Sequence, residues 1–205
     1  MTLRAVFFDV GETLVDEERY WREVSRIAGV PPHVVWAALG KTIARGEEHW
    51  ELWRHLGVRR PAADGVVYSE DDLYPDARPA LAEVRACGVL VGVAGNQTPA
   101  MEEWARSVGL PVDLVTSSAS LGVRKPDSAF FERLVSLAGA TPAEVAYVGD
   151  RVDNDVLPAL RAGLVAFHLR RGPWGLLQET PQGAVAIDSL LDVPSHLGAT
   201  SAVGA

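Results

Sequence analysis

Four polar residues each follow a short apolar run of the chain, and their types suit chemistry on a phosphate group. They are Asp9 in "FFDVGETL", Asn96 in "VAGNQ", Lys125 in "GVRKPD" and Asp150 in "YVGDRVDND". Two carboxylates can hold a hard divalent cation such as Mg²⁺, which takes oxygen ligands and can bridge to a phosphate. A lysine adds a compact positive charge for phosphate oxygens. If these residues meet in the fold, they predict a magnesium-assisted site for a phosphorylated ligand.

The apolar runs that precede these residues have the length of buried parallel strands. They span residues 3–8, 89–94, 112–115, 145–148 and 164–169. Helical patterns that end at a glycine lie between several of them, at residues 79–86, 100–108, 128–137 and 155–162. This order predicts an α/β fold with a parallel sheet covered on both faces. Such sheets bind ligands at the carboxyl ends of their strands, which is where the polar residues fall.

The segment from Val15 to Leu73 breaks the alternation of strand and helix. It shows helical periodicity without a convincing strand, and it contains four of the six tryptophans: Trp21, Trp36, Trp50 and Trp53. We expect a helical insertion whose tryptophans pack a small core rather than form a ligand cage. The predicted organisation is a core of residues 1–14 and 74–197, an insertion of residues 15–73, and a flexible tail of residues 198–205.

Composition limits the partners of the chain. Its 205 residues carry a net charge of −8 and a sequence pI of about 5.1, which disfavours nucleic acid and anionic membrane surfaces as partners. The single Cys87 cannot form an internal disulfide, and no leader or spanning segment is evident. We therefore expect a cytoplasmic protein with a small-molecule substrate. The sequence does not indicate an oligomeric state.

The polar blocks resemble the motifs of the haloacid dehalogenase (HAD)-like hydrolase superfamily. In that family the first strand ends in Asp-x-Asp-x-Thr, the second ends in Ser or Thr, a Lys-Pro precedes a later helix, and Gly-Asp with a further Asp closes the site. The similar residues here are Asp9 with Thr13, Gly95-Asn96, Lys125-Pro126, and Gly149-Asp150 with Asp155. The resemblance implies a Rossmann-like core, with the insertion forming a small helical cap.

The resemblance also implies a covalent mechanism and assigns roles to residues. Asp9 would attack a phosphoryl group and form an aspartyl-phosphate. The ligands of Mg²⁺ would be Asp9, the backbone carbonyl of Gly11, and Asp150. Lys125 would offset negative charge and Asp155 would orient the site, while the substrate phosphate would contact Thr13, Gly95, Asn96 and Lys125. The expected activity is that of a magnesium-dependent phosphatase acting on a small phosphorylated metabolite.

Two positions depart from the family pattern. Gly11 stands where the family's phosphatases carry an aspartate that acts as general acid, and Gly95 stands at the position of the Ser or Thr hydroxyl. Because general acid catalysis contributes about 10² to 10⁴-fold, alkyl phosphates are expected to be poor substrates. Glu12 is either a solvated loop residue or a displaced acid, and the solvated alternative is favoured. A carbon–halogen hydrolase, whose halide leaves without a proton, and a weakly active or non-catalytic binding module remain alternatives.

Overall fold

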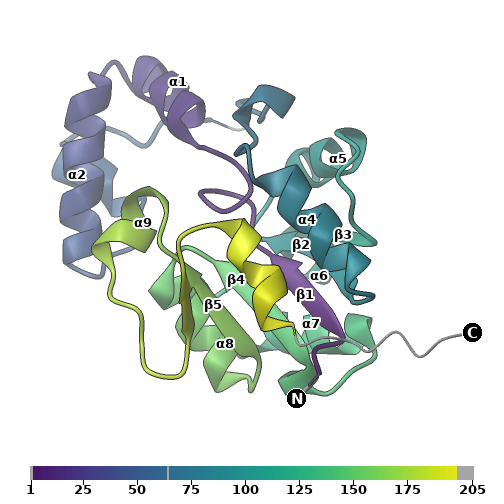
Figure 1. The fold of residues 1–205 in the computed structure, drawn as a ribbon. Helices are drawn as coiled ribbons and strands as arrows, with labels where there is room; N and C mark the ends of the chain where they lie inside the picture. The colour runs from purple at the N-terminus through teal and green to yellow at the C-terminus, as the bar shows by residue number, and fades with distance from the viewer. Residues whose placement is uncertain (1, 64, 198–205) are drawn as a thin grey trace, which may run out of the picture.

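A single sheet of six parallel strands forms the centre of the molecule (Figure 1). The structure, a computed structural model, describes residues 2–63 and 65–197. The strands are β1 (Ala5–Phe8), β2 (Leu90–Gly95), β3 (Leu114–Ser117), β4 (Val145–Gly149), β5 (Val165–Leu169) and β6 (Val185–Ile187). Their spatial order is β3-β2-β1-β4-β5-β6, the doubly wound order whose switch point lies between β1 and β4. The predicted α/β, Rossmann-like fold class is confirmed.

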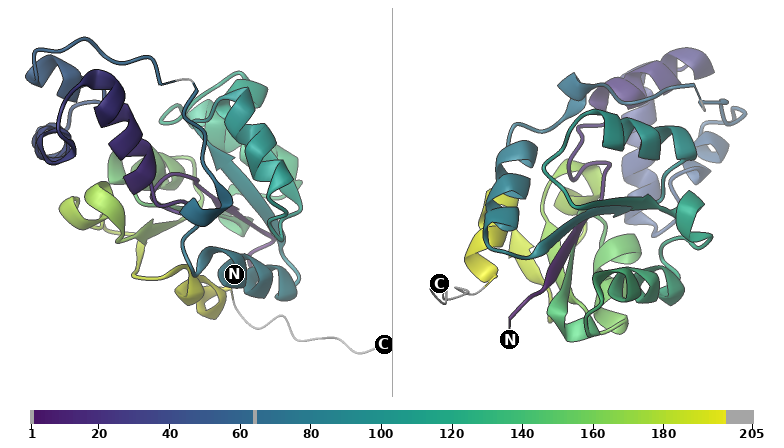
Figure 2. Two further views of the ribbon diagram at one scale, coloured as in Figure 1. Left: turned by 90° about the horizontal axis from the view of Figure 1, so that it is seen from above. Right: turned by 90° about the vertical axis from the view of Figure 1, so that its right-hand side faces the viewer.

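Helices cover both faces of the sheet, as Figure 2 shows. One face packs on α4 (Ala77–Ala86), α5 (Pro99–Ser107) and η4 (Leu190–His196), and the other on α7 (Ser128–Ala138) and α8 (Leu157–Arg161). Successive side chains of a strand point to opposite faces. Accordingly, Val6 and Phe8 of β1 join the first core, whereas Phe7 joins the second. The polar residue that follows β1 is therefore held on a strand buried on both sides.

The predicted insertion contains three α-helices with a core of their own. They are α1 (Glu18–Ala28), α2 (Pro32–Ala44) and α3 (Glu51–His55). Trp21 and Trp53 are buried in this core as expected, while Trp50 is only partly buried against it. Trp174 of α9 (Gly172–Leu177) joins the same cluster from the C-terminal half of the chain, and α9 lies beside α2 in Figure 1. This contact fixes the cap against the sheet domain.

Three details differ from the sequence-based expectations. Strand β3 begins at Leu114 rather than Val112, because the carboxylate of Asp113 accepts the Val91 amide at 3.0 Å before the regular ladder starts. The predicted helix of residues 155–162 begins instead as a π-helical turn, η3 (Val152–Val156), which then continues into α8. A sixth strand, β6, forms from the apolar residues 185–187, which are not among the five predicted strands. The predicted tail, residues 198–205, lies outside the described residues.

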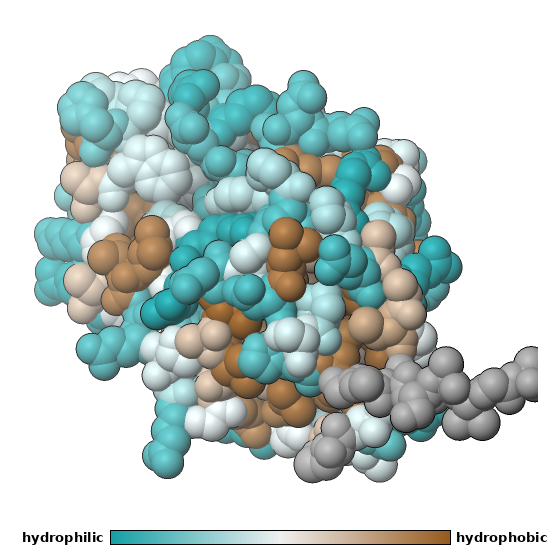
Figure 3. All heavy atoms as spheres, in the orientation of Figure 1, coloured by the Kyte–Doolittle hydropathy of each residue, from teal (hydrophilic) through white to brown (hydrophobic). Residues whose placement is uncertain are grey.

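The remaining elements are short: η1 (Glu70–Asp72), α6 (Ser118–Leu121) and η2 (Pro142–Glu144). The face shown in Figure 3 is mixed, with hydrophilic and apolar areas, and one apolar patch lies where α9 lies in Figure 1. This helix exposes Leu176 and Leu177 while its Trp174 is buried toward the cap. Over residues 2–63 and 65–197, no helix has the length and apolar character needed to cross a membrane.

Candidate active site

The strand ends bring the predicted site residues together around one buried lysine. Asp9 follows β1, Asp150 follows β4, and Asp155 belongs to η3. Lys125 comes from the loop between α6 and α7, and its Nζ lies 2.9 Å from Asp9 Oδ1 and 2.6 Å from Asp155 Oδ1. All four side chains are buried, with Lys125 only 1% exposed. The prediction that these residues converge is therefore met by the geometry.

The cluster has more negative than positive charge. Carboxylate oxygens of Asp9, Asp150 and Asp155 all lie within 4.8 Å of one another, and Lys125 is the cation in contact with two of them. Burial, reinforced by Asp155 and Asp9, raises the pKa of Asp150 well above its usual range. Burial also raises the pKa of Asp155 to about 6, although Lys125 opposes this shift. For Lys125, burial opposes the charge, but the two carboxylates outweigh it and raise its pKa.

The residues present fit a divalent cation. Asp150 Oδ2 is buried, and within the described part of the chain it has no hydrogen-bond partner. Asp155 belongs to the same acidic group, but its Oδ1 contacts Lys125 and its Oδ2 accepts the Arg151 amide at 3.0 Å. Asp9 and Asp150 therefore have the oxygens best able to bind metal. Carboxylate oxygens without nitrogen or sulfur donors suit Mg²⁺.

Asn96 positions the lysine loop. Its Nδ2 donates to the Lys125 carbonyl at 2.9 Å, and its Oδ1 accepts the Lys125 amide at 2.9 Å. Because the side-chain amide is committed on both sides, its predicted contact with the substrate stays a prediction. The geometry assigns it a second role, which is to hold Lys125 against Asp9.

Gly95 and Thr13 occupy different environments. A Cβ added at Gly95 would lie 2.5 Å from Asp9 Oδ1, so glycine leaves room for the carboxylate to reach Lys125. This contact gives a physical reason for the missing hydroxyl. Thr13 is fully buried, and its hydroxyl makes no hydrogen bond to the described residues. The roles of Gly95 and Thr13 in substrate binding remain predictions.

The expectation that Glu12 is solvated is wrong. Its side chain is 4% exposed, and its carboxylate accepts hydrogen bonds from the Tyr74 hydroxyl at 2.7 Å and the Glu17 amide at 3.2 Å. The backbone of Glu12 has a φ of 51°, which turns the side chain inward rather than into solvent. Burial, with a contribution from Glu17, raises the pKa of Glu12 to about 8.

The space beside Gly11 is occupied by a carboxyl group from farther along the chain. A Cβ added at Gly11 would lie 2.5 Å from Glu17 Oε1. The Glu17 carboxyl also accepts hydrogen bonds from the Tyr68 hydroxyl and from Trp21 Nε1. Burial raises the pKa of Glu17, and nearby Asp9 adds to the shift. The sequence does not indicate this residue, because Asp16, Glu17 and Glu18 are three consecutive acids. Only the turn before α1 determines that the side chain of Glu17 enters the cavity.

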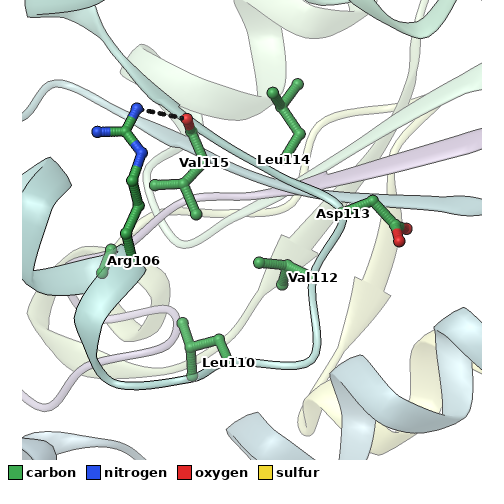
Figure 4. Close-up of a pocket in the computed structure, with 7 residues that line it drawn as sticks. Arg106, Leu110, Val112, Asp113, Leu114 and Val115 are labelled. Atoms are coloured by element: carbon green, nitrogen blue, oxygen red, sulfur yellow. Dashed lines mark hydrogen bonds between the residues drawn. The ribbon is translucent and has the colours of Figure 1, made fainter.

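One cavity of about 730 Å³ contains this machinery. Asp9, Gly11, Lys125 and Asp150 of the core line it, together with Glu17 and other residues of the insertion. A separate hollow of about 410 Å³ lies along strand β3 (Figure 4). There Arg106 donates to the Val115 carbonyl at 3.1 Å, beside mainly apolar side chains. None of the converging acids lines this second hollow, so the chemistry belongs to the first cavity.

Comparison with known proteins identifies the family. Residues 3–163 match the model of the haloacid dehalogenase-like hydrolases. The chain belongs to this family. It is 30% identical over 203 residues to a glyceraldehyde 3-phosphate phosphatase of Methanopyrus kandleri, covering 84% of this chain and 86% of the relative.

Solved structures of two activities share the fold. A HAD phosphatase from Thermococcus onnurineus superposes with a TM-score of 0.64 at 19% identity, covering 96% of this chain and 99% of that one. The L-2-haloacid dehalogenase of Xanthobacter autotrophicus gives a TM-score of 0.65 at 22% identity, with coverages of 94% and 97%. The family shows that the chain is a hydrolase, whereas these structures support the fold alone.

The contacts of Asn96 predict how its loss affects the enzyme. In Asn96→Ala the Lys125 main chain loses two hydrogen bonds, so we expect a loss of about 1–2 kcal/mol in unfolding free energy. Misplacement of Lys125 is expected to lower kcat by roughly 10- to 100-fold with little change in KM. Steady-state kinetics and denaturant unfolding measure both effects. Gln97→Ala, which removes a neighbouring amide that also lines the cavity, is the control. A raised KM with unchanged kcat would instead assign Asn96 to substrate binding.

Proposed function

We propose that this hydrolase is a magnesium-dependent phosphatase that acts on a small phosphorylated metabolite through an aspartyl-phosphate on Asp9. The observation that carries the proposal is the buried Oδ2 of Asp150, which has no hydrogen-bond partner among the described residues and lies in the cluster with Asp9 and Lys125. A cation there would allow a carboxylate to approach an anionic phosphate. The phosphatase name of the Methanopyrus kandleri relative supports the same activity. The proposal includes a cytoplasmic location.

The residues of the chain divide the work of two displacements. Asp9 attacks phosphorus and forms a P–O bond as the bond to the leaving oxygen breaks, and water then releases inorganic phosphate and regenerates Asp9. Lys125 holds the Asp9 carboxylate in place and neutralises part of its charge, while Asp155 anchors Lys125. Bound Mg²⁺, held by Asp9, Asp150 and the Gly11 carbonyl, would neutralise charge on the phosphoryl oxygens.

Glu17 is the best placed proton donor. Its carboxyl occupies the space beside Gly11, and it lines the cavity with Asp9. Glu12 lines the cavity too, but its carboxyl is held by Tyr74, whereas Glu17 lies close enough to Asp9 for the charge of Asp9 to act on it. In the first step Glu17 gives its proton to the leaving oxygen, and in the second its carboxylate takes a proton from the attacking water. This role would compensate for the missing aspartate at position 11.

A haloacid dehalogenase is the second candidate. The fold shared with the Xanthobacter autotrophicus enzyme and the absence of a side chain at Gly11 favour it. Displacement of halide from carbon, however, gives no use to Asp150 Oδ2, a buried oxygen without a hydrogen-bond partner in the part of the chain that the structure describes. We therefore favour the phosphatase.

The nucleophile is tested by Asp9→Asn. The amide keeps the shape of the side chain but loses its charge, so turnover of an aryl phosphate is expected to fall by at least about 10³-fold. The assay uses wild type and variant on p-nitrophenyl phosphate, with Mg²⁺ and with a chelator. A parallel assay follows chloride release from 2-chloropropionate. Full activity of the variant would contradict the covalent mechanism, and chloride release by wild type without phosphatase activity would favour the dehalogenase.

The proton donor is tested by Glu17→Gln. Without the acid the departing oxygen keeps its developing charge, so kcat/KM should fall more steeply as the pKa of the leaving group rises. We expect a loss of about 10²-fold or more on alkyl phosphates and a much smaller loss on p-nitrophenyl phosphate. Glu12→Gln is the matched control and should not change the slope. If Glu17→Gln leaves the slope unchanged, or Glu12→Gln steepens it, the assignment to Glu17 is wrong.

A further inference from the structure

Two arginines from different parts of the chain converge on one tryptophan of the cap. The guanidinium carbon of Arg60 lies 5.8 Å from the centre of the Trp50 ring, and that of Arg124 lies 5.7 Å from it. Arg60 follows α3 in the cap, whereas Arg124 belongs to the core loop that also supplies Lys125. All three side chains line the 730 Å³ cavity. The aromatic ring thus holds two cations at the boundary between cap and core.

His49 shows how close the positive charges are. Its ring lies 4.9 Å from Trp50 and 6.4 Å from Trp174, centre to centre. Burial, followed by the charges of Arg151, Arg60 and Arg124, lowers the pKa of His49 to about 4. Three guanidinium groups therefore act on one side of the cavity, and the histidine among them is neutral.

Two of these three arginines are available for a ligand. Arg151 forms an ion pair with Asp153 at 2.6 Å. Over residues 2–63 and 65–197, no carboxylate forms an ion pair with Arg60 or Arg124. The chain as a whole has a net charge of −8. Cations that face a cavity in an acidic protein without a carboxylate partner indicate an anionic ligand.

These arginines are separate from the group that handles the reacting phosphate. Lys125 directs its ammonium to Asp9 and Asp155, whereas the guanidinium of the preceding residue, Arg124, lies over Trp50 of the cap. The cavity therefore has an acidic, metal-binding side at the strand ends and a cationic, aromatic side at the cap. A substrate that spans both sides needs a negative group at each end.

We propose that Arg60 and Arg124, supported by Trp50, form a subsite for a second anionic group, so that the substrate is a small phosphate monoester with a carboxylate or a second phosphate. This inference rests on the proposed phosphatase activity and specifies the substrate class. The planar guanidinium fork binds two oxygens of either group, and stacking on Trp50 orients it. Because one arginine comes from the cap and the other from the core, the second anion would also link the two parts.

Three substrates with the same three-carbon chain test the subsite. They are 3-hydroxypropyl phosphate, 3-(phosphonooxy)propanoate and propane-1,3-diyl bisphosphate, which end in a hydroxyl, a carboxylate and a second phosphate. Wild type in Mg²⁺ is expected to favour one or both anionic substrates over the hydroxyl compound by about tenfold or more in kcat/KM, which equals about 1.4 kcal/mol. The preferred member distinguishes a carboxylate from a phosphate ligand. The double variant Arg60→Met/Arg124→Met is expected to lose this preference.

Arg54→Met is the matched control. Arg54 is an exposed arginine of α3 that pairs with Glu51 and does not line the cavity, so its loss should leave the preference unchanged. Equal kcat/KM values for the three substrates in wild type would overturn the subsite while leaving the phosphatase intact. An equal loss on all three in the double variant would show general attraction of phosphate, and would also overturn it.

Binding separates failure of the subsite from failure of the proposed function. If wild type hydrolyses none of the three compounds and no p-nitrophenyl phosphate, the proposed activity fails. Calorimetry with the bisphosphate and 3-hydroxypropyl phosphate then decides the subsite by itself. Tighter binding of the bisphosphate to wild type, lost in the double variant but kept in Arg54→Met, supports it. Equal binding of the two compounds contradicts it.

Discussion

The buried contact of Lys125 with Asp9 and Asp155 is the interaction on which the rest of the site depends. One ammonium lies 2.9 Å from an oxygen of Asp9, which follows β1, and 2.6 Å from an oxygen of Asp155, which belongs to η3. A side chain at Gly95 or Gly149 would displace one of these carboxylates, because an added Cβ would lie 2.5 Å from a carboxylate oxygen of Asp9 or Asp155, respectively. Asn96 then fixes the lysine loop through two main-chain hydrogen bonds. The two glycines, the charge of Lys125 and the hydrogen bonds of Asn96 therefore act together to position the two carboxylates.

This arrangement leaves an excess of negative charge. Three carboxylates lie close to one ammonium, that of Lys125. The effect is greatest at Asp150, where burial and the nearby carboxylates raise the pKa well above its usual range. A site that concentrates like charges destabilises the apo protein in return for metal and substrate binding. On the cap side the imbalance is opposite, because Arg60 and Arg124 form no ion pair with a carboxylate among the described residues. The cavity is thus polarised from one end to the other.

The sequence predicts the strand-end residues well, because parallel strands bring their carboxyl ends to one edge wherever the helices between them lie. Asp9, Lys125, Asp150 and Asp155 converge for this reason. The sequence does not predict the burial of Glu12, because this burial depends on a left-handed backbone and on Tyr74, 62 residues away. Glu17 and the pair of Arg60 with Arg124 could not be predicted, since the position of the cap depends on tertiary packing. Trp174 supplies part of that packing through a helix that composition alone did not indicate.

Thermal unfolding of wild type and Asp150→Asn as a function of Mg²⁺ tests whether the buried carboxylates form a cation site. The folded pKa of Asp150 is raised, so its contribution to stability is present below about pH 4 and is lost as pH rises. At pH 7 without Mg²⁺ the variant should therefore have the higher Tm. Mg²⁺ should raise the Tm of wild type, because binding at 100 times Kd adds about 2.7 kcal/mol to the free energy of unfolding. The Tm of the variant should not change. A wild-type Tm that does not respond to millimolar Mg²⁺, or an equal response of the Tm in Asp150→Asn, would contradict a cation site at these carboxylates.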